Sequence, residues 1–206
     1  MSTDELTGVQ ALERKPPGLP LAPGKVERRA FESIRHGTRA FILSRDVVSG
    51  EVVAPHAGPT RNEADFAAHV QAVVDTDPQA TRWHFVCDNL TIHQSETLVR
   101  FVAERSEIDA DLGLKGESGR LASLVSRAAF LSDPTHQIVF HSTPKHSSWL
   151  NQIEIWLSIL VRKLLTRGSF TSVEDLQARV LAFIAYYNQT MARPFQWTYQ
   201  GKALTA

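Results

Sequence analysis

Residues 83–93 read Trp-His-Phe-Val-Cys-Asp-Asn-Leu-Thr-Ile-His, and the change from apolar to polar residues at Asp88 decides the fold. The apolar run that ends at Cys87 predicts a short buried strand, which Asp88 follows directly. In α/β sheets, a carboxylate at the carboxyl end of a buried strand faces the crevice where ligands bind. Asp and Asn also begin turns and cap helices, so Asp88 and Asn89 have that structural interpretation as well.

The segments around this strand predict a mixed sheet covered by helices. Apolar runs at 40–48 and 51–57 flank Ser49-Gly50, which predicts a hairpin, and another strand is expected at 137–141. Helices are expected after the capping signal Thr60-x-x-Glu63 and at 94–104, 121–131, 147–167 and 172–189. The order hairpin, helix, strand, helix, strand, helix, helix indicates the α/β class.

Composition fits one compact domain of 206 residues, 43% of them hydrophobic. Cys87 is the only cysteine, which excludes a disulfide framework and a thiolate zinc site and favours a reducing cytosol. No apolar run approaches the roughly 18 residues of a membrane span, so no membrane partner is expected. The 22 basic and 22 acidic residues balance, so the composition does not predict tight nucleic-acid binding by this chain alone.

Two segments stand apart from the predicted sheet and helices. The proline-rich residues 16–24 predict an extended loop, and the glycine-containing residues 106–135 predict an insertion with one helix. Basic residues gather in two stretches, which either contact a polyanion or form solvated faces. The stretches are Arg14, Lys15, Lys25, Arg28, Arg29, Arg35 and Arg39, and then Arg162, Lys163 and Arg167.

Glu154 is unusual because it lies in an otherwise apolar helical segment, three residues after Asn151 and on the same face. It could lie on the solvent side of that helix, but the surrounding aromatic residues disfavour a fully exposed face. Together with Asp4 and Asp88 it could form a set of hard oxygen ligands, which suits Mg²⁺ or Mn²⁺. Two such ions about 4 Å apart can support in-line displacement at phosphorus.

Three sequence blocks resemble the Tc/mariner superfamily of DDE transposases, and most closely its bacterial insertion-sequence branch. The first runs from Asp4-Glu5 to Arg14, and the second is Cys87-Asp88-Asn89-x-x-x-His93. The third, which is the most specific, spans residues 143–156 and reads Thr-Pro-Lys-His-Ser-Ser-Trp-Leu-Asn-Gln-Ile-Glu-Ile-Trp. The tail motif Ala185-Tyr-Tyr-Asn188 adds to the similarity, which covers nearly the whole chain.

The resemblance implies an RNase H-like catalytic domain over residues 1–206. Its catalytic and metal-binding residues would be Asp4, Asp88 and Glu154, holding two Mg²⁺ or Mn²⁺ ions. The matching residues Asn89, His93 and Asn151 would lie beside the metal ligands without binding metal. Residues Lys145, His146, Arg162 and Lys163 would contact DNA. The partners implied are transposon ends and target DNA, with a homodimer for the full-length protein and a location in the bacterial cytosol or nucleoid.

Two departures from the family pattern affect these expectations. The 65 residues 89–153 between Asp88 and Glu154 exceed the usual spacing, and the excess maps to 106–135. Only three residues precede Asp4 and Thr7-Gly8 resembles a turn, so the helix-turn-helix domain is expected to be absent and the first strand largely missing.

Three functions are compatible with the residues. The first is a transposase domain that cleaves DNA at element ends and joins the 3′-hydroxyl to a target. The second is a non-catalytic remnant that at most binds DNA or a full-length transposase. A small-molecule phosphohydrolase is disfavoured because Asp4-Glu5-Leu6 lacks the nucleophilic Asp-x-Asp pattern.

Overall fold

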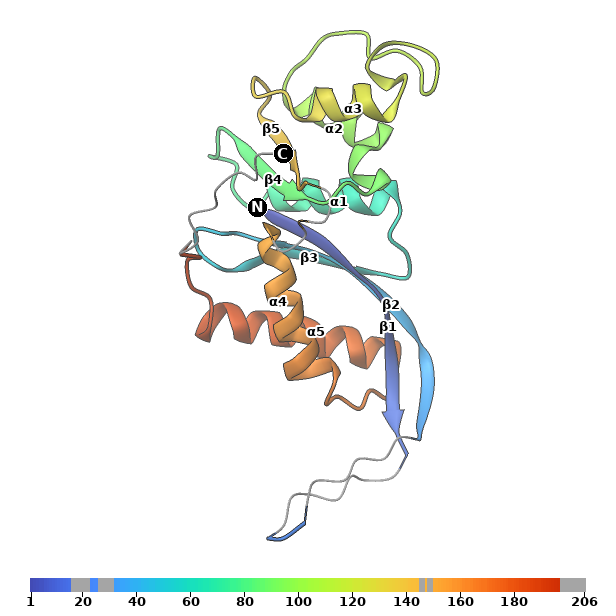
Figure 1. Cartoon of the computed structure of the whole chain (residues 1–206), viewed down its shortest axis with the longest axis vertical. Helices are drawn as coiled ribbons and strands as arrows, with labels where there is room; N and C mark the ends of the chain where they lie inside the picture. Colours follow the sequence, from blue (N-terminus) through green and yellow to red (C-terminus); the bar gives the residue numbers. More distant parts are fainter. Residues whose placement is uncertain (16–22, 26–31, 145–146, 148–149, 197–206) are drawn as a thin grey trace, which may run out of the picture.

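A five-stranded mixed sheet forms the centre of the molecule in a computed structural model, which describes all residues except 16–22, 26–31, 145–146, 148–149 and 197–206 (Figure 1). The strands are β1 (Ser2–Arg14), β2 (Ser33–Arg45), β3 (Val52–Gly58), β4 (Trp83–Cys87) and β5 (Ile138–Ser142). Their order is β3-β2-β1-β4-β5. Strand β2 is antiparallel to both β1 and β3, and β4 is parallel to both β1 and β5. The predicted mixed sheet is therefore confirmed. The proline-rich stretch 16–24 lies mostly outside the described residues.

In the described part of the chain, five α-helices cover the two faces of this sheet. They are α1 (Glu63–Val74), α2 (Glu96–Arg105), α3 (Leu124–Leu131), α4 (Gln152–Leu160) and α5 (Val173–Thr190). Short turns of other helical types are η1 (Thr91–Gln94), η2 (Gly119–Leu121) and the π-helical turn η4 (Val161–Leu165) that continues α4. No helix in the described part of the chain is long and apolar enough to cross a membrane.

The first helix begins later than its sequence signal suggested. Asn62, and not Thr60, is the N-cap, because its side chain accepts hydrogen bonds from the amides of Ala64 and Asp65. Thr60 instead donates its hydroxyl to Asp65 at 2.7 Å, which supports the same cap from outside. Asn was as good a capping residue as Thr on chemical grounds, so the sequence left both choices open.

Each face of the sheet has its own core. Helices α1, α2 and α3 pack on one face around Phe66, Phe85 and Phe140, with the Phe85 and Phe140 rings stacked at 5.1 Å. Helices α4 and α5 pack on the other face, where Trp156 and Phe41 are fully buried. Successive residues of β2 point into opposite cores, because side chains alternate between the two faces of a strand.

The expectation that the first strand is largely missing is wrong. Strand β1 has 13 residues, with Asp4 near its beginning, and it pairs with β2 from Ser2 opposite Arg45 to Arg14 opposite Ser33. Most of the strand follows Asp4 in sequence. Thr7-Gly8, which resembled a turn, is a β-bulge in which Gly8 adopts a φ of 63°. Because a bulge and a turn use the same residue types, composition alone did not separate them.

The bulge decides which side chains of β1 share a face. Asp4 lies opposite Leu43 of β2, a residue of the α4–α5 core. Beyond the bulge, Val9 and Ala11 belong to the same core, although their numbers are odd and that of Asp4 is even. The extra residue reverses the alternation. Asp4 is therefore presented on the face that α4 and α5 cover.

Asn188 of α5 fastens that helix to the edge of the sheet. Its amide Nδ2 donates to the carbonyl of Val52 at 2.8 Å, and its Oδ1 accepts from the amide of Val52 at 3.0 Å. One side chain thus satisfies both backbone groups of a β3 residue, as a neighbouring strand would.

We predict that Asn188→Ala lowers the free energy of unfolding by about 1–3 kcal/mol, because two partly buried backbone groups lose their partners. Urea denaturation followed by circular dichroism measures this loss. Gln189→Ala, at the exposed neighbouring position, is the control and should change stability by less than about 0.5 kcal/mol. Equal losses in the two variants would show that the Asn188 contacts contribute nothing specific.

Candidate active site

Two aspartates are brought together by the register of adjacent parallel strands. Ser2 of β1 pairs with Val86 of β4, and the amide of Val86 donates to the carbonyl of Met1 at 2.8 Å. Asp4 and Asp88 each lie two residues beyond this pair, at equivalent positions of the two chains. The strand at Trp83–Cys87 was predicted correctly, and Asp88 follows it at its carboxyl end.

Asn151 attaches the start of α4 to β1. Its Nδ2 donates to the carbonyl of Thr3 at 3.0 Å, and its Oδ1 accepts from the hydroxyl of Ser2. The same hydroxyl accepts from the amide of Ile153 at 2.8 Å. Asn151 and Ser2 are buried, so water does not compete for these contacts. The first turn of α4, which carries Glu154, is therefore held against β1 beside Asp4.

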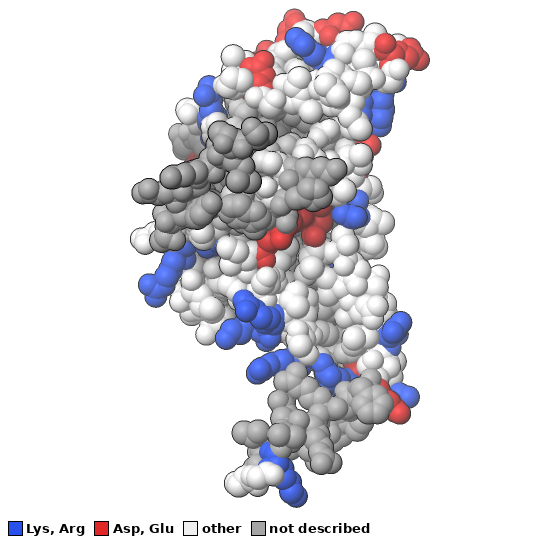
Figure 2. Space-filling model, in the orientation of Figure 1, with Lys and Arg blue, Asp and Glu red and all other residues white. Residues whose placement is uncertain are grey.

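Asp4 and Glu154 line one open cleft of about 490 Å³, together with Leu157, Ser158, Val161 and Arg162. Glu154 therefore faces an open cleft that it shares with Asp4. Its neighbours Ile153 and Trp156 point into the core, which turns Glu154 toward the cleft. In the view of Figure 2, acidic side chains gather at the middle of the molecule, with Lys and Arg side chains below them.

The carboxylates of this cleft have little compensation for their charge. Burial is the largest cause that raises the pKa of Asp4, and the charges of Glu5, Asp88 and Glu154 add to it. A hydrogen bond from the amide of Glu5 acts against them, and the net pKa is about 6. Asp4 therefore lies within the electrostatic reach of both other predicted ligands, and a cation would relieve the repulsion among them.

These donors fit a hard divalent cation. Carboxylate oxygens beside an open cleft are the ligands that Mg²⁺ and Mn²⁺ prefer. No group of three or more His, Cys, Asp or Glu side chains is arranged to hold one ion within the described residues. Mg²⁺ commonly takes only one or two protein carboxylates and completes its shell with water and phosphate oxygens. A pair of carboxylates such as Asp4 and Glu154, which line the same cleft, therefore suits Mg²⁺.

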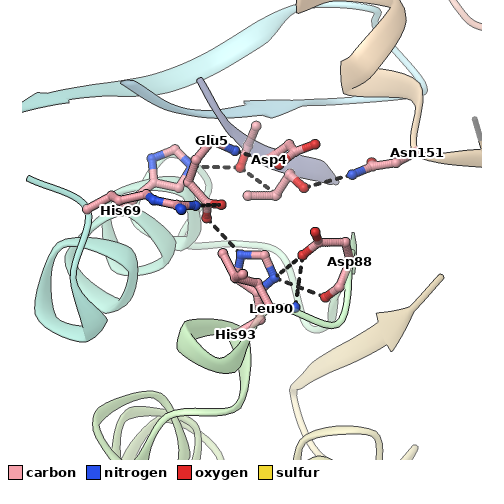
Figure 3. A network of polar contacts seen from close by, with 10 residues as sticks. Asp4, Glu5, His69, Asp88, Leu90, His93 and Asn151 are labelled. Atoms are coloured by element: carbon pink, nitrogen blue, oxygen red, sulfur yellow. Dashed lines mark hydrogen bonds and ion pairs between the residues drawn. The ribbon is translucent and has the colours of Figure 1, made fainter. Parts of the chain in front are cut away.

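His93 and Glu5 form a buried connection to Asp88 (Figure 3). The imidazole Nδ1 lies 2.9 Å from Oδ1 of Asp88, and Nε2 lies 2.7 Å from Oε1 of Glu5. Burial lowers the pKa of His93, but hydrogen bonds to Asp88, Cys87 and Glu5 outweigh burial and raise that pKa to about 12. The hydrogen bond from His93 in turn holds the pKa of Asp88 below its usual range.

Sequence reasoning placed His93 near the site but gave Glu5 no role. Glu5 follows Asp4 directly and so points to the opposite face of β1, toward α1 and η1. The available signal was the position of Glu5 in the first motif block, but the contact with His93 depends on a pairing of distant segments. Asn89, also expected beside the ligands, donates to the carbonyl of Thr143 at 3.1 Å and joins the ends of β4 and β5.

The residues expected to contact DNA are partly described. Arg162 lines the carboxylate cleft and also a second cavity of about 390 Å³, which Lys163, Arg167 and Ile159 share. The turn η4 carries Arg162 and Lys163 at the end of α4. Lys145 and His146 lie outside the described residues. A basic surface thus adjoins the acidic cleft through Arg162.

Comparison with known proteins found one family model and several solved structures. A family model described as a DDE superfamily endonuclease matches residues 1–177. No curated protein gives a significant match. The chain is similar to the Mos1 mariner paired-end complex with Mn, with a TM-score of 0.56 and 14% identity over 89% of this chain and 47% of that chain. The Mos1 transposase paired-end complex with left transposon end gives 0.51 and 14%, over 89% and 46%.

The chain therefore spans about half of the length of the transposase chains that it matches. At 14% identity, the likeness concerns the fold, and it confirms the expected RNase H-like architecture.

We predict that Asp4→Asn stabilises the metal-free protein at pH 8 and not at pH 4. The folded pKa of Asp4 is raised from 3.8 to about 6, so its contribution to stability is lost as the pH rises through 6. A neutral amide avoids this loss, and a gain of a few degrees in melting temperature is expected at pH 8. Calorimetry in the presence of a chelator measures it.

Asp133→Asn serves as the control with the opposite sign. Hydrogen bonds from Thr135 hold the pKa of Asp133 below its usual range, so this variant should not gain stability at pH 8. A melting temperature of Asp4→Asn at or below that of the wild type at pH 8 would contradict the charge repulsion inferred for the cleft.

Proposed function

The chain belongs to the DDE superfamily of endonucleases, and from this premise we propose that it is a transposase catalytic domain that cuts and joins DNA strands with divalent metal ions. One observation carries the proposal. Asp4 of β1 and Glu154 of α4 line an open cleft that Arg162 also lines, and the charge of Asp88, at the end of β4, acts on Asp4. Phosphoryl transfer mainly requires positioning and charge neutralisation, and this arrangement offers both.

Asp4, Asp88 and Glu154 would hold the ions. Bound Mg²⁺ or Mn²⁺ activates a water or 3′-hydroxyl and stabilises the leaving oxygen of an in-line displacement. The protein positions its carboxylates through contacts already described: Asn151 holds the helix of Glu154, and His93 holds Asp88. The neighbouring carboxylates keep the cleft negative, which favours a divalent cation over a monovalent one.

DNA is the substrate that suits the surroundings of the cleft. Arg162 and Lys163 would contact phosphates on either side of the reacting position, and Lys145 and His146 would add contacts by family resemblance. Such contacts position a duplex without reading its sequence. The paired-end complexes of Mos1 hold transposon ends, so we propose element ends and target DNA as substrates and a homodimer as the full-length assembly. The insertion-sequence branch and a bacterial cytosol are proposed on the motif blocks.

We predict that Asp88→Asn and Glu154→Gln each reduce Mn²⁺-dependent nicking of supercoiled plasmid by at least about 100-fold, because neutral amides remove the ligand charge that hard cations require. Gel-shift assays should show DNA binding within about twofold of the wild type. Asp133→Asn changes a partly exposed carboxylate before β5; it is the control and should nick normally.

Nicking by either site variant at the wild-type rate would refute the assigned roles. A wild-type chain that folds cooperatively and binds DNA but does not nick would favour the non-catalytic remnant.

We also predict that the double substitution of Arg162 and Lys163 by alanine weakens DNA binding equally for all sequences. Each lost phosphate contact should reduce the slope of log affinity against log salt by about one. Fluorescence anisotropy at several salt concentrations measures this slope. Arg100→Ala, on α2, removes an exposed arginine that pairs with Glu96, and the slope should then stay unchanged. A sequence-dependent loss would mean that these residues read bases.

A further inference from the structure

Backbone pairing brings the strands of Asp4 and Asp88 together over a short stretch only. Within the described residues, the register of β1 with β4 consists of one pair, Ser2 with Val86. By contrast, β4 and β5 pair continuously from Trp83 with Ile138 to Cys87 with Ser142. The two aspartates lie just beyond the single pair. Side-chain contacts can therefore add to the backbone in setting how the two aspartates are oriented.

The side chain of His93 spans this gap. It joins Glu5 on β1, at 2.7 Å, to Asp88 at the end of β4, where Nδ1 also lies 3.0 Å from the main-chain carbonyl (Figure 3). The side chains of Glu5 and His93 are each 1% exposed. The ring of Phe66 packs on the imidazole at 4.4 Å between centroids, which restricts its rotation. The contact between Glu5 and His93 is therefore shielded from water and rigid.

Two carboxylates hold the imidazole of His93 from opposite sides. Its Nε2 faces Oε1 of Glu5, and its Nδ1 faces Oδ1 of Asp88. Arg61 lies 3.6 Å from the other oxygen of Glu5 and pairs with it. These contacts restrict the movement of the imidazole.

The contacts to Asp88 select one of its oxygens. Oδ1 accepts from the amide of Leu90 at 3.0 Å and faces Nδ1 of His93 at 2.9 Å. The carboxylate is still 46% exposed, so its other oxygen keeps its lone pairs for a ligand. The arrangement resembles the way in which partners behind a metal ligand orient it.

We propose that Glu5 and His93 are positioning residues that set the orientation of Asp88 relative to Asp4. Both faces of β1 then contribute to the site. One face carries Asp4, and the other carries Glu5, which holds Asp88 through His93. This inference rests on the proposed function, because the orientation of Asp88 matters only if Asp88 binds the metal ion. It adds Glu5 to the residues on which metal binding depends.

The experiment compares Mn²⁺ affinity with stability in the full chain. Titration calorimetry measures Mn²⁺ binding, melting curves with a chelator measure stability, and plasmid nicking is followed against Mn²⁺ concentration. Glu5→Ala should weaken Mn²⁺ binding about 10- to 100-fold, the loss typical when a partner behind a metal ligand is removed. The Mn²⁺ concentration for half-maximal nicking should rise by the same factor. Glu5→Gln keeps an acceptor for His93, so its loss should be smaller.

Two comparisons separate positioning from a merely structural role. Ser44→Ala breaks the buried chain of Thr3, Ser44 and His69 on the same face of the sheet, so it should cost stability and leave Mn²⁺ affinity unchanged. In a His93→Ala background, Glu5→Ala should weaken Mn²⁺ binding no further, because Glu5 acts only through His93.

The outcomes distinguish this inference from the proposed function. If Asp88→Asn loses Mn²⁺ affinity while Glu5→Ala and Glu5→Gln bind as the wild type does, the positioning role is refuted and the metal site stands. Independent, additive losses from Glu5 and His93 would also refute it. If Asp88→Asn binds Mn²⁺ as tightly as the wild type, the proposed function and this inference fail together. If Glu5→Ala does not fold, the folded Glu5→Gln variant decides between these outcomes.

Discussion

The contact between Ser2 and Asn151 is the constraint on which the site depends. Three buried hydrogen bonds, to or from the Ser2 hydroxyl and the Asn151 amide, fix the start of α4 on the central strand. Without them, Glu154 would sit on a helix whose approach is set only by apolar packing, which is tolerant of small shifts. Directional bonds remove that tolerance at the one point where α4 meets β1. Asp4 on β1 and Glu154 on α4 then keep a constant position relative to each other.

Close to this contact, packing buries a carboxylate whose charge is repelled by its neighbours. The fold places Asp4 where burial and three other carboxylates disfavour its charge, while His93 and Arg61 pair with Glu5 on the opposite face of β1 and His93 also contacts Asp88. Asp4 and Glu154 leave the cleft negative. Natural proteins tolerate such local costs mainly at functional sites. Here the cost is confined to a few residues between two well-packed cores.

Sequence reasoning predicted most of the fold, and its errors have identifiable causes. Strands such as Trp83–Cys87 and the long α5 follow from local periodicity, which a single sequence records. The extent of β1 was missed because Gly8 permits either a turn or a bulge, and only pairing with β2 decides between them. Glu5 was missed because its partner His93 lies 88 residues away, and strand pairing brings the two together.

The bulge at Thr7-Gly8 has a consequence for how the chain tolerates changes in length. Removing one residue there would convert the bulge into regular pairing, in which Asp4, Val9 and Ala11 still share a face of the sheet. Removing a second residue would send either Asp4 or the pair Val9 and Ala11 to the wrong face. Between Asp4 and the core, the length of the strand is therefore constrained by parity. The segment before α3 is not a strand, so no such parity rule applies to its length.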